Sequence, residues 1–221
     1  MTNKKIVLLP THGATIKQKI TSQDKWRSST MNWYEKLSQY FPVEEMKSKE
    51  HMEILLEEKG DIYHKDEGPN HVLMYVELED FIFIDYLFVS KDARGQGLGH
   101  KLLEKLKQKG KAIILEVEPI NYKDSDSEKR LRFYKREDFK HAASIGYNRK
   151  SLATNEANKM EILYWSPTND PEEAIYDAMK KTYKMIHTYR DEEIYGKAYQ
   201  TVDEVLTYNK DFVNEDILTD L

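Results

Sequence analysis

The sequence contains no cysteine among its 221 residues. Without thiols, the chain can form neither a disulfide framework nor a thiolate metal site, and a cysteine nucleophile is excluded. No apolar run approaches the roughly 20 residues that a membrane-spanning helix needs. The short apolar segment at residues 6–9 is also too brief for the core of a signal peptide. These absences predict a soluble, cytoplasmic protein that does not bind membranes.

A basic surface and a metal motif are also missing. The net charge is -5, whereas nucleic-acid-binding domains usually carry a basic face, so we expect no nucleic-acid partner. The seven histidines show no metal-ligand spacing, and no His-Glu-x-x-His segment occurs, so we expect no metal. The length suits one domain with appendages. We predict an N-terminal segment (1–30) with a short strand or an arm, a main domain (31–167) and a helical extension (168–221) packed on that domain.

The most informative stretch of the sequence is residues 81–118, which combines β-rich runs with a glycine-rich turn. Its predicted elements are a strand (81–89), a turn (90–99), a helix (about 98–109) and a second strand (112–118). Gly95, Gly97 and Gly99 have no Cβ, so bare backbone can approach a ligand closely. Amides at a helix N-terminus are unpaired and attract anions. The stretch therefore predicts a phosphate-binding turn.

Two common phosphate-binding patterns do not fit this turn. The dinucleotide fingerprint needs a glycine at the sixth place, and counting from Gly95 this place is His100. The Walker loop ends in Gly-Lys-Ser/Thr, but the chain has His100, Lys101 and Leu102 there. A third pattern, Arg/Gln-x-x-Gly-x-Gly/Ala, does fit, through Arg94, Gly97 and Gly99. It resembles the acyl-CoA pyrophosphate loop of the GNAT superfamily of N-acyltransferases.

A second segment, residues 131–139, also resembles the GNAT superfamily. Phe133, Tyr134 and Phe139 match its Phe-Tyr-x-x-x-Gly-Phe pattern. Asp138 replaces the usual glycine, which adopts a left-handed conformation after the helix. Because Asp tolerates that conformation better than most residues, we expect the turn to survive. Ser127 stands where an Asn is often found.

The resemblance covers about residues 40–165 and implies the fold. It implies an α/β (α+β) domain with a mixed, mostly antiparallel central sheet flanked by helices, to which the C-terminal helical extension is added. Periodicity and capping signals give further expectations. We predict helices at about 31–41 and 42–59, a strand at 139–147, and two tail helices, one starting at Asp170-Pro171 and one at about 193–207.

The resemblance also implies acetyl-CoA as a co-substrate. The amides of residues 95–99 and the Arg94 side chain would hold its phosphates, and the strand backbone of residues 87–89 would face pantetheine and the thioester. The expected cofactor contacts are Leu87, Phe88, Val89, Arg94, Gly95, Gln96, Gly97, Leu98, Gly99 and Tyr134.

Four residues are candidates for the acid and the base of the acetyl transfer. By resemblance, Tyr134 is the acid that protonates the departing thiolate; the alternative is a tyrosine that only packs its helix onto the sheet. Glu116 and Glu118 are two apart on a strand and so face the same side, where one of them could act as the base. Asp85 interrupts an apolar strand and is the third candidate base, and Glu77 is a weaker fourth. For each carboxylate the alternative is a merely exposed or ion-paired group.

Together these features predict an N-acetyltransferase. It would transfer an acetyl group from acetyl-CoA to a primary amine, by direct attack in a ternary complex. The acidic residues favour a cationic acceptor, either a small molecule or a peptide. The alternative is a non-catalytic acyl-CoA-binding or regulatory module. The apolar stripes of the tail predict docking against the core, or alternatively a homodimer interface.

Overall fold

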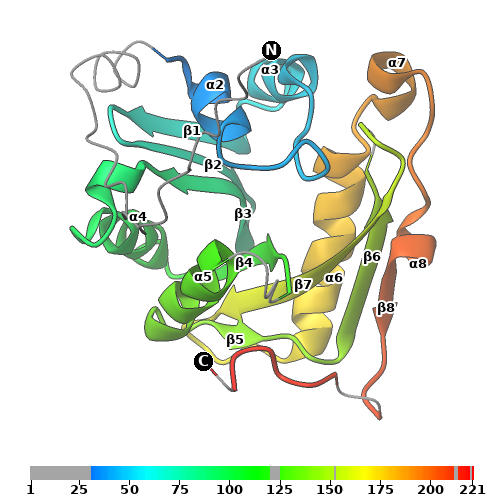
Figure 1. The fold of residues 1–221 in the computed structure, drawn as a ribbon. Coiled ribbons are helices and arrows are strands. Elements are labelled where there is room, and N and C mark those ends of the chain that lie inside the picture. The colour runs from blue at the N-terminus through cyan, green and yellow to red at the C-terminus, as the bar shows by residue number, and fades with distance from the viewer. Residues whose placement is uncertain (1–30, 120–124, 152, 212–213, 220) are drawn as a thin grey trace, which may run out of the picture. The chain divides into compact units, whose positions relative to one another are not determined.

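The computed structural model describes residues 31–119, 125–151, 153–211, 214–219 and 221. The chain divides into two units, residues 1–31 and residues 32–221. The arm and short strand expected at residues 1–30 lie outside the described residues. Everything below concerns the second unit, whose elements are labelled in Figure 1.

A single mixed sheet forms the centre of this unit (Figure 1). Its order is β1-β2-β3-β4-β7-β6-β8, with β5 beside β7. The strands are β1 (Tyr63–Gly68), β2 (His71–Glu77), β3 (Phe81–Val89), β4 (Ala112–Val117), β5 (Lys140–His141), β6 (Ile145–Lys150), β7 (Ala157–Trp165) and β8 (Leu206–Tyr208). Of these pairings only β3 with β4 is parallel. The predicted mixed, mostly antiparallel sheet is therefore confirmed.

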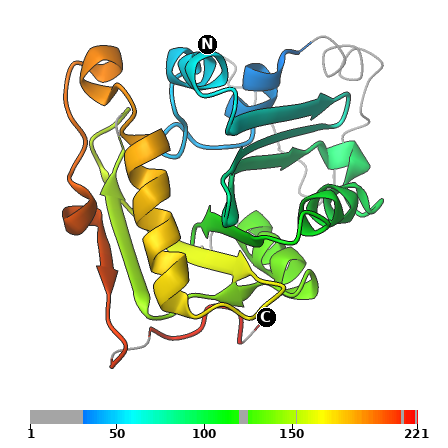
Figure 2. The same ribbon diagram turned by 180° about the vertical axis from the view of Figure 1, so that it is seen from behind.

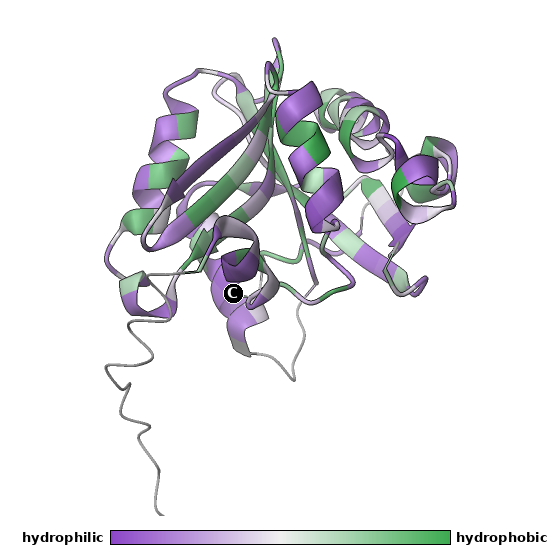
Figure 3. Cartoon of the chain, turned by 90° about the horizontal axis from the view of Figure 1, so that it is seen from above, coloured by the Kyte–Doolittle hydropathy of each residue, from purple (hydrophilic) through white to green (hydrophobic). Residues whose placement is uncertain are grey.

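Helices cover both faces of the sheet. They are α2 (Trp33–Ser38), α3 (Lys49–Glu58), α4 (Leu98–Lys107), α5 (Ser125–Arg136), α6 (Glu172–Thr182), a π-helical turn (Tyr183–His187), α7 (Asp191–Tyr195) and α8 (Val202–Val205), with a 3₁₀ turn at Lys91–Ala93. Apolar residues of α4 and α5 pack in one core cluster, and those of α2, α3 and α6 in another. Figure 2 shows α6 lying across the sheet, and Figure 3 shows that hydrophobic and hydrophilic residues alternate along the helices. No helix of the described segments is long and apolar enough to cross a membrane.

Strands β3 and β4 separate partway along their length. Their parallel pairing runs from Phe81 opposite Ala112 to Ile84 opposite Leu115. Beyond that point β3 continues to Val89, where its described partner is β2 alone. The backbone of residues 86–89 therefore has one edge that β4 does not occupy. Such an edge can pair with an extended ligand.

A β-bulge on β3 lies where the strands separate. Met74 pairs with Tyr86 and Tyr75 pairs with Ile84, so the pairing passes over Asp85. A bulge adds one unpaired residue and changes which face the following side chains occupy. Accordingly Phe83 and Tyr86 both pack in the cluster with α3 and α6, although they are three positions apart.

The predicted helix at residues 42–59 is wrong in its first half. Helix α3 begins only at Lys49, with Ser48 as its N-cap. Residues 42–48 form turns instead, and the Tyr86 hydroxyl of β3 holds them: it donates to the Glu45 carbonyl (3.0 Å) and accepts from the Lys47 amide (2.9 Å). Pro42 favours a helix start locally, but these tertiary hydrogen bonds take the groups that a helix would use.

Two other predicted elements differ from the structure. The strand expected at 139–147 is two strands, β5 and β6, separated by a turn in which the Ile145 amide donates to the Ala142 carbonyl. The helix expected at 193–207 is divided between α7, α8 and strand β8, because Gly196 ends α7 at a φ of 70° and residues 206–208 pair with β6. The left-handed conformation expected at Asp138 is confirmed, with a φ of 62°.

Candidate functional site

The glycine-rich turn has the backbone that an anion site needs. Gly95 and Gly97 have φ values of 76° and 78°, which residues with a Cβ rarely adopt. Gly97 is the N-cap of α4 and has no side chain to accept hydrogen bonds from the first-turn amides. Those amides, together with the positive end of the helix dipole, face outward from the turn.

A cavity of about 520 Å³ opens beside this turn. Residues of β3, the turn, α4 and α5 line it, and its lining includes five cationic side chains, Arg94, Lys129, Arg130, Arg132 and Arg136. Among the described residues, two carboxylates, Asp126 and Glu137, line the same cavity. This excess of positive charge suits a polyanionic ligand such as a nucleotide diphosphate.

Most of the expected cofactor contacts line this cavity: Leu87, Val89, Arg94, Gly95, Gly97, Leu98, Gly99 and Tyr134. Two do not. Phe88 points to the opposite face of β3, where its ring lies 5.8 Å from that of Tyr40, and the side-chain amide of Gln96 donates to the Asp92 carbonyl (2.6 Å). Arg94 is held at the rim, because its Nε donates to the Val89 carbonyl and its Nη1 contacts Asp126.

A second, smaller cavity of about 40 Å³ lies in the gap between β3 and β4. Leu87, Arg130 and Tyr134 line both cavities, so the two meet at these residues. Burial raises the pKa of the Tyr134 phenol, which therefore keeps its proton at neutral pH. A protonated hydroxyl at this junction can donate a proton to a group held between the cavities.

The three carboxylates predicted as candidate bases, Asp85, Glu116 and Glu118, all line the second cavity. Glu77 does not line it, and instead pairs with Lys109 and Lys111. The structure thus brings together the three carboxylates that were proposed as bases.

Two of these carboxylates have partners that suit a structural role. Asp85 accepts a hydrogen bond from Tyr63 (2.7 Å) and lies 2.6 Å from Lys47 Nζ. Glu116 lies 2.9 Å from His187 Nε2 and 3.6 Å from Arg149 Nε. Burial opposes ionisation of Glu116, but the charges of His187, Arg149 and Lys47 outweigh it and lower the pKa of Glu116 to about 2. Such a carboxylate remains ionised and accepts a proton poorly at neutral pH.

The third carboxylate, Glu118, has a different environment. It lies one residue beyond the end of β4, and Arg130 Nη2 contacts it at 2.8 Å. Glu45, from the turns before α3, also lines this cavity, beside Glu118. Burial and then the nearby Glu118 raise the pKa of Glu45 to about 8.

Sequence reasoning missed Glu45, Lys47, Arg149 and His187. Glu45 and Lys47 were placed in a helix that does not form there, and His187 belongs to the tail beyond the region of resemblance. Burial, followed by the Lys47 charge, lowers the pKa of His187, while the neighbouring Glu116 opposes this shift. No local signal distinguishes these residues, because their roles depend on contacts with distant strands.

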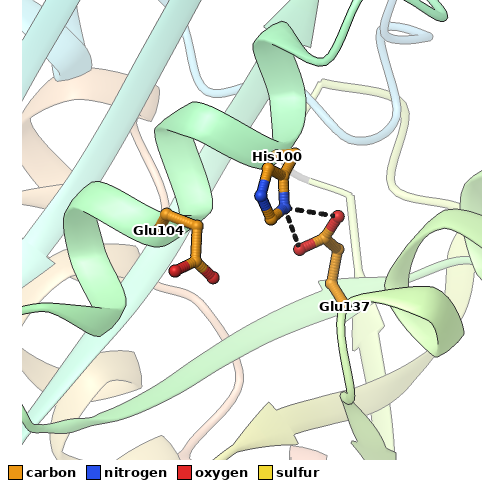
Figure 4. Close-up of side chains that lie close together, drawn as sticks. All are labelled: His100, Glu104 and Glu137. Atoms are coloured by element: carbon orange, nitrogen blue, oxygen red, sulfur yellow. Dashed lines mark hydrogen bonds and ion pairs between the residues drawn. The ribbon is translucent and has the colours of Figure 1, made fainter.

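A cluster of His100, Glu104 and Glu137 lies between α4 and the end of α5 (Figure 4), and two of its members, His100 and Glu137, also line the larger cavity. Their donor atoms lie within 4.8 Å of one another, as in a metal site. However, Lys107 Nζ lies 3.1 Å from Glu104 and 3.5 Å from Glu137. The ammonium group already supplies the positive charge that a metal ion would bring, so we interpret the cluster as a network of ion pairs.

Comparison with known proteins gives the family. Residues 55–141 match the family described as "Acetyltransferase (GNAT) domain". A protein of Bacillus subtilis (strain 168) described as "Putative acetyltransferase YjbC" is 69% identical over 176 residues, which cover 80% of this chain and 92% of that protein. A solved structure, "Putative acetyltransferase from GNAT family from Bacteroides thetaiotaomicron", aligns at 23% identity with a TM-score of 0.55, over 76% of this chain and 96% of its own. The chain therefore belongs to the GNAT acetyltransferase family.

Proposed function

We propose that this protein transfers an acetyl group from acetyl-CoA to the primary amine of a cationic acceptor, by direct attack in a ternary complex. The observation that supports this most directly is the meeting of the two cavities at Tyr134. One cavity is basic and borders the glycine turn, and the other is lined by four carboxylates. A thioester at the junction would have a phosphate site on one side and a cation site on the other.

The residues of the larger cavity would hold acetyl-CoA. Amides of the Gly95–Gly99 turn would bind the pyrophosphate with Arg94 as a charged partner. The edge of β3 that β4 leaves open would pair with pantetheine, and an N–H near Val89 would face the thioester oxygen. One such donor contributes about 10²–10³ in rate.

In the reaction the amine nitrogen attacks the thioester carbonyl. The C–N bond forms, the C–S bond breaks, and Tyr134 gives its proton to the departing thiolate. Asp85 and Glu116 would form the wall of the acceptor side, where close cationic partners hold both carboxylates in place.

The proposal is tested by binding and by turnover. Acetyl-CoA at 100 times its dissociation constant should raise the free energy of unfolding by about 2.7 kcal/mol, which thermal shift detects. Thiol release measured over a panel of amines should then show turnover with acceptors that carry several positive charges. No stabilisation at millimolar acetyl-CoA would contradict the proposal.

A non-catalytic acyl-CoA-binding module is the second candidate. The observation that favours it is the volume of the second cavity, about 40 Å³, which is small for an entire acceptor. Stabilisation by acetyl-CoA without thiol release for any amine of the panel would select this alternative.

The glycine turn gives a matched pair of variants. Gly97→Ala and Gly110→Ala both place a Cβ at positive φ (78° and 69°) with no atom within 4 Å of it. Each should lower the free energy of unfolding by about 1 kcal/mol through backbone strain, measured by urea unfolding. Only Gly97→Ala should weaken acetyl-CoA binding, by about tenfold or 1.4 kcal/mol, because Gly97 lines the larger cavity. Equal binding by the two variants would mean that the turn does not hold the phosphates.

A further inference from the structure

Glu45 reaches the second cavity because the turns that carry it are fixed to β3. The Tyr86 hydroxyl donates to the Glu45 carbonyl and accepts from the Lys47 amide. Tyr86 itself is buried, with 4% of its surface exposed. The backbone from the Glu45 carbonyl to the Lys47 amide is therefore held against the strand, and the Glu45 side chain lines the cavity.

The charges around this cavity are unequal. Four carboxylates line it, those of Glu45, Asp85, Glu116 and Glu118. Three of them have a cation within 4 Å: Lys47 beside Asp85 (2.6 Å), Arg149 beside Glu116 (3.6 Å) and Arg130 beside Glu118 (2.8 Å). Within the described part of the chain, none of the ion pairs includes Glu45.

Glu45 also has an unused buried oxygen. Its Oε1 atom is buried and has no hydrogen-bond partner among the described residues. A buried acceptor without a donor costs free energy, so this atom is a suitable place for a ligand N–H group. One ammonium ion would give the four carboxylates a fourth cation.

We propose that Glu45 and Glu118 form a pair that binds the acceptor's ammonium group and takes its proton before attack. This inference rests on the proposed function and identifies the proton acceptor, a role for which neither Asp85 nor Glu116 is suited. The ammonium gives one proton to the pair, and the neutral amine then attacks the thioester. The second proton lost by the amide nitrogen restores the Tyr134 phenol, so one proton leaves to solvent in each turnover.

The raised pKa of Glu45 supports this role. Burial, followed by the hydrogen bond and charge of Glu118, raises the pKa of Glu45 to about 8, against the opposing charges of Arg130 and Arg149. Asp85, Glu116 and the Tyr134 phenol also face the cavity. A general base is most effective when its pKa lies near the working pH, and a carboxyl group reaches this range only when its ionised form is destabilised.

Carbon-13 NMR of the full-length protein labelled at the glutamate carboxyl carbons tests the pair without any acceptor. One resonance should titrate near pH 8 and should be lost in Glu45→Gln. In Glu118→Gln its midpoint should fall by at least one pH unit, because the repulsion from Glu118 is removed. Glu44→Gln, on the neighbouring residue, should leave it unchanged. If every carboxyl group titrates below pH 6, or if the resonance survives Glu45→Gln, the inference is overturned.

Turnover provides the second readout, with the panel amine that releases thiol fastest. For the wild type, kcat/KM should rise with pH, with a midpoint near pH 8. In Glu118→Gln this rise should occur at lower pH. In Glu45→Gln, kcat/KM should fall by about 100-fold, at the low end of general-base effects, and should no longer rise with pH in this range. An active Glu45→Gln variant with an unchanged pH profile overturns the inference alone. Absence of thiol release from the wild type with every amine overturns the proposed function and this base role together.

Discussion

Replacing Tyr134 with phenylalanine is expected to lower kcat by about 100-fold to 10,000-fold, the range of general acid–base effects. The substitution removes only the hydroxyl group, so the ring keeps its contacts with Phe133 and Phe139. The loss should therefore appear in turnover and not in folding. Acetyl-CoA affinity, measured by calorimetry, should stay within about twofold, since the phosphate site at the glycine turn is intact.

A matched control separates the acid from a packing tyrosine. Tyr75 is buried in the same core cluster as Tyr134 but lines neither cavity. Tyr75→Phe should leave kcat within about twofold, while both variants should show similar midpoints in thermal unfolding. If Tyr134→Phe retains kcat within threefold of the wild type, then Tyr134 only packs α5 on the sheet.

Replacing Lys47 with methionine is expected to lower the free energy of unfolding by about 3–5 kcal/mol, the usual cost of leaving one buried charge without its partner. The side chains of Lys47 and Asp85 are 7% and 4% exposed, and Nζ lies 2.6 Å from the carboxylate. Methionine fills the volume of the lysine stem but cannot compensate the charge. Urea unfolding at pH 7 measures the loss.

Two further variants show whether charge is the cause. Lys49→Met removes an exposed lysine that pairs with Glu53, and should change stability by less than about 1 kcal/mol. Adding Asp85→Asn to Lys47→Met removes the uncompensated charge and should recover more than half of the loss. A loss below about 1 kcal/mol for Lys47→Met alone would mean that water or another cation reaches Asp85.

The parts of the candidate site that depend on adjacent residues are the ones that the sequence predicts. The turn from Arg94 to Gly99 is recognisable because one short segment supplies the strand end, the glycines and the helix N-terminus. Tyr134 was predicted for the same reason, from a pattern within nine residues. Asp138 stands where the GNAT pattern has glycine, and it still adopts the left-handed conformation, with a φ of 62°. The turn is therefore determined by its local sequence even without the glycine.

Prediction failed where a distant group replaced a local preference. Residues 42–48 have the composition of a helix start, but the Tyr86 hydroxyl binds their backbone and keeps them in turns. Residues 206–208 have helical spacing, but they pair with β6 at the edge of the sheet. In both segments one tertiary hydrogen-bonding partner outweighs a propensity of a few tenths of a kcal/mol per residue.

The sequence by itself determined the family-like core: a mixed sheet, a glycine turn at the start of α4, and Tyr134 on α5. These follow from periodicity and from backbone requirements that act within one or two elements. Only the tertiary structure decided which carboxylates have cations and which do not, because Lys47, Arg149 and His187 reach β3 and β4 from separate parts of the chain. Electrostatic interactions depend on distance in space and on burial, so the environment of Glu45 became visible only after folding placed it beside Glu118.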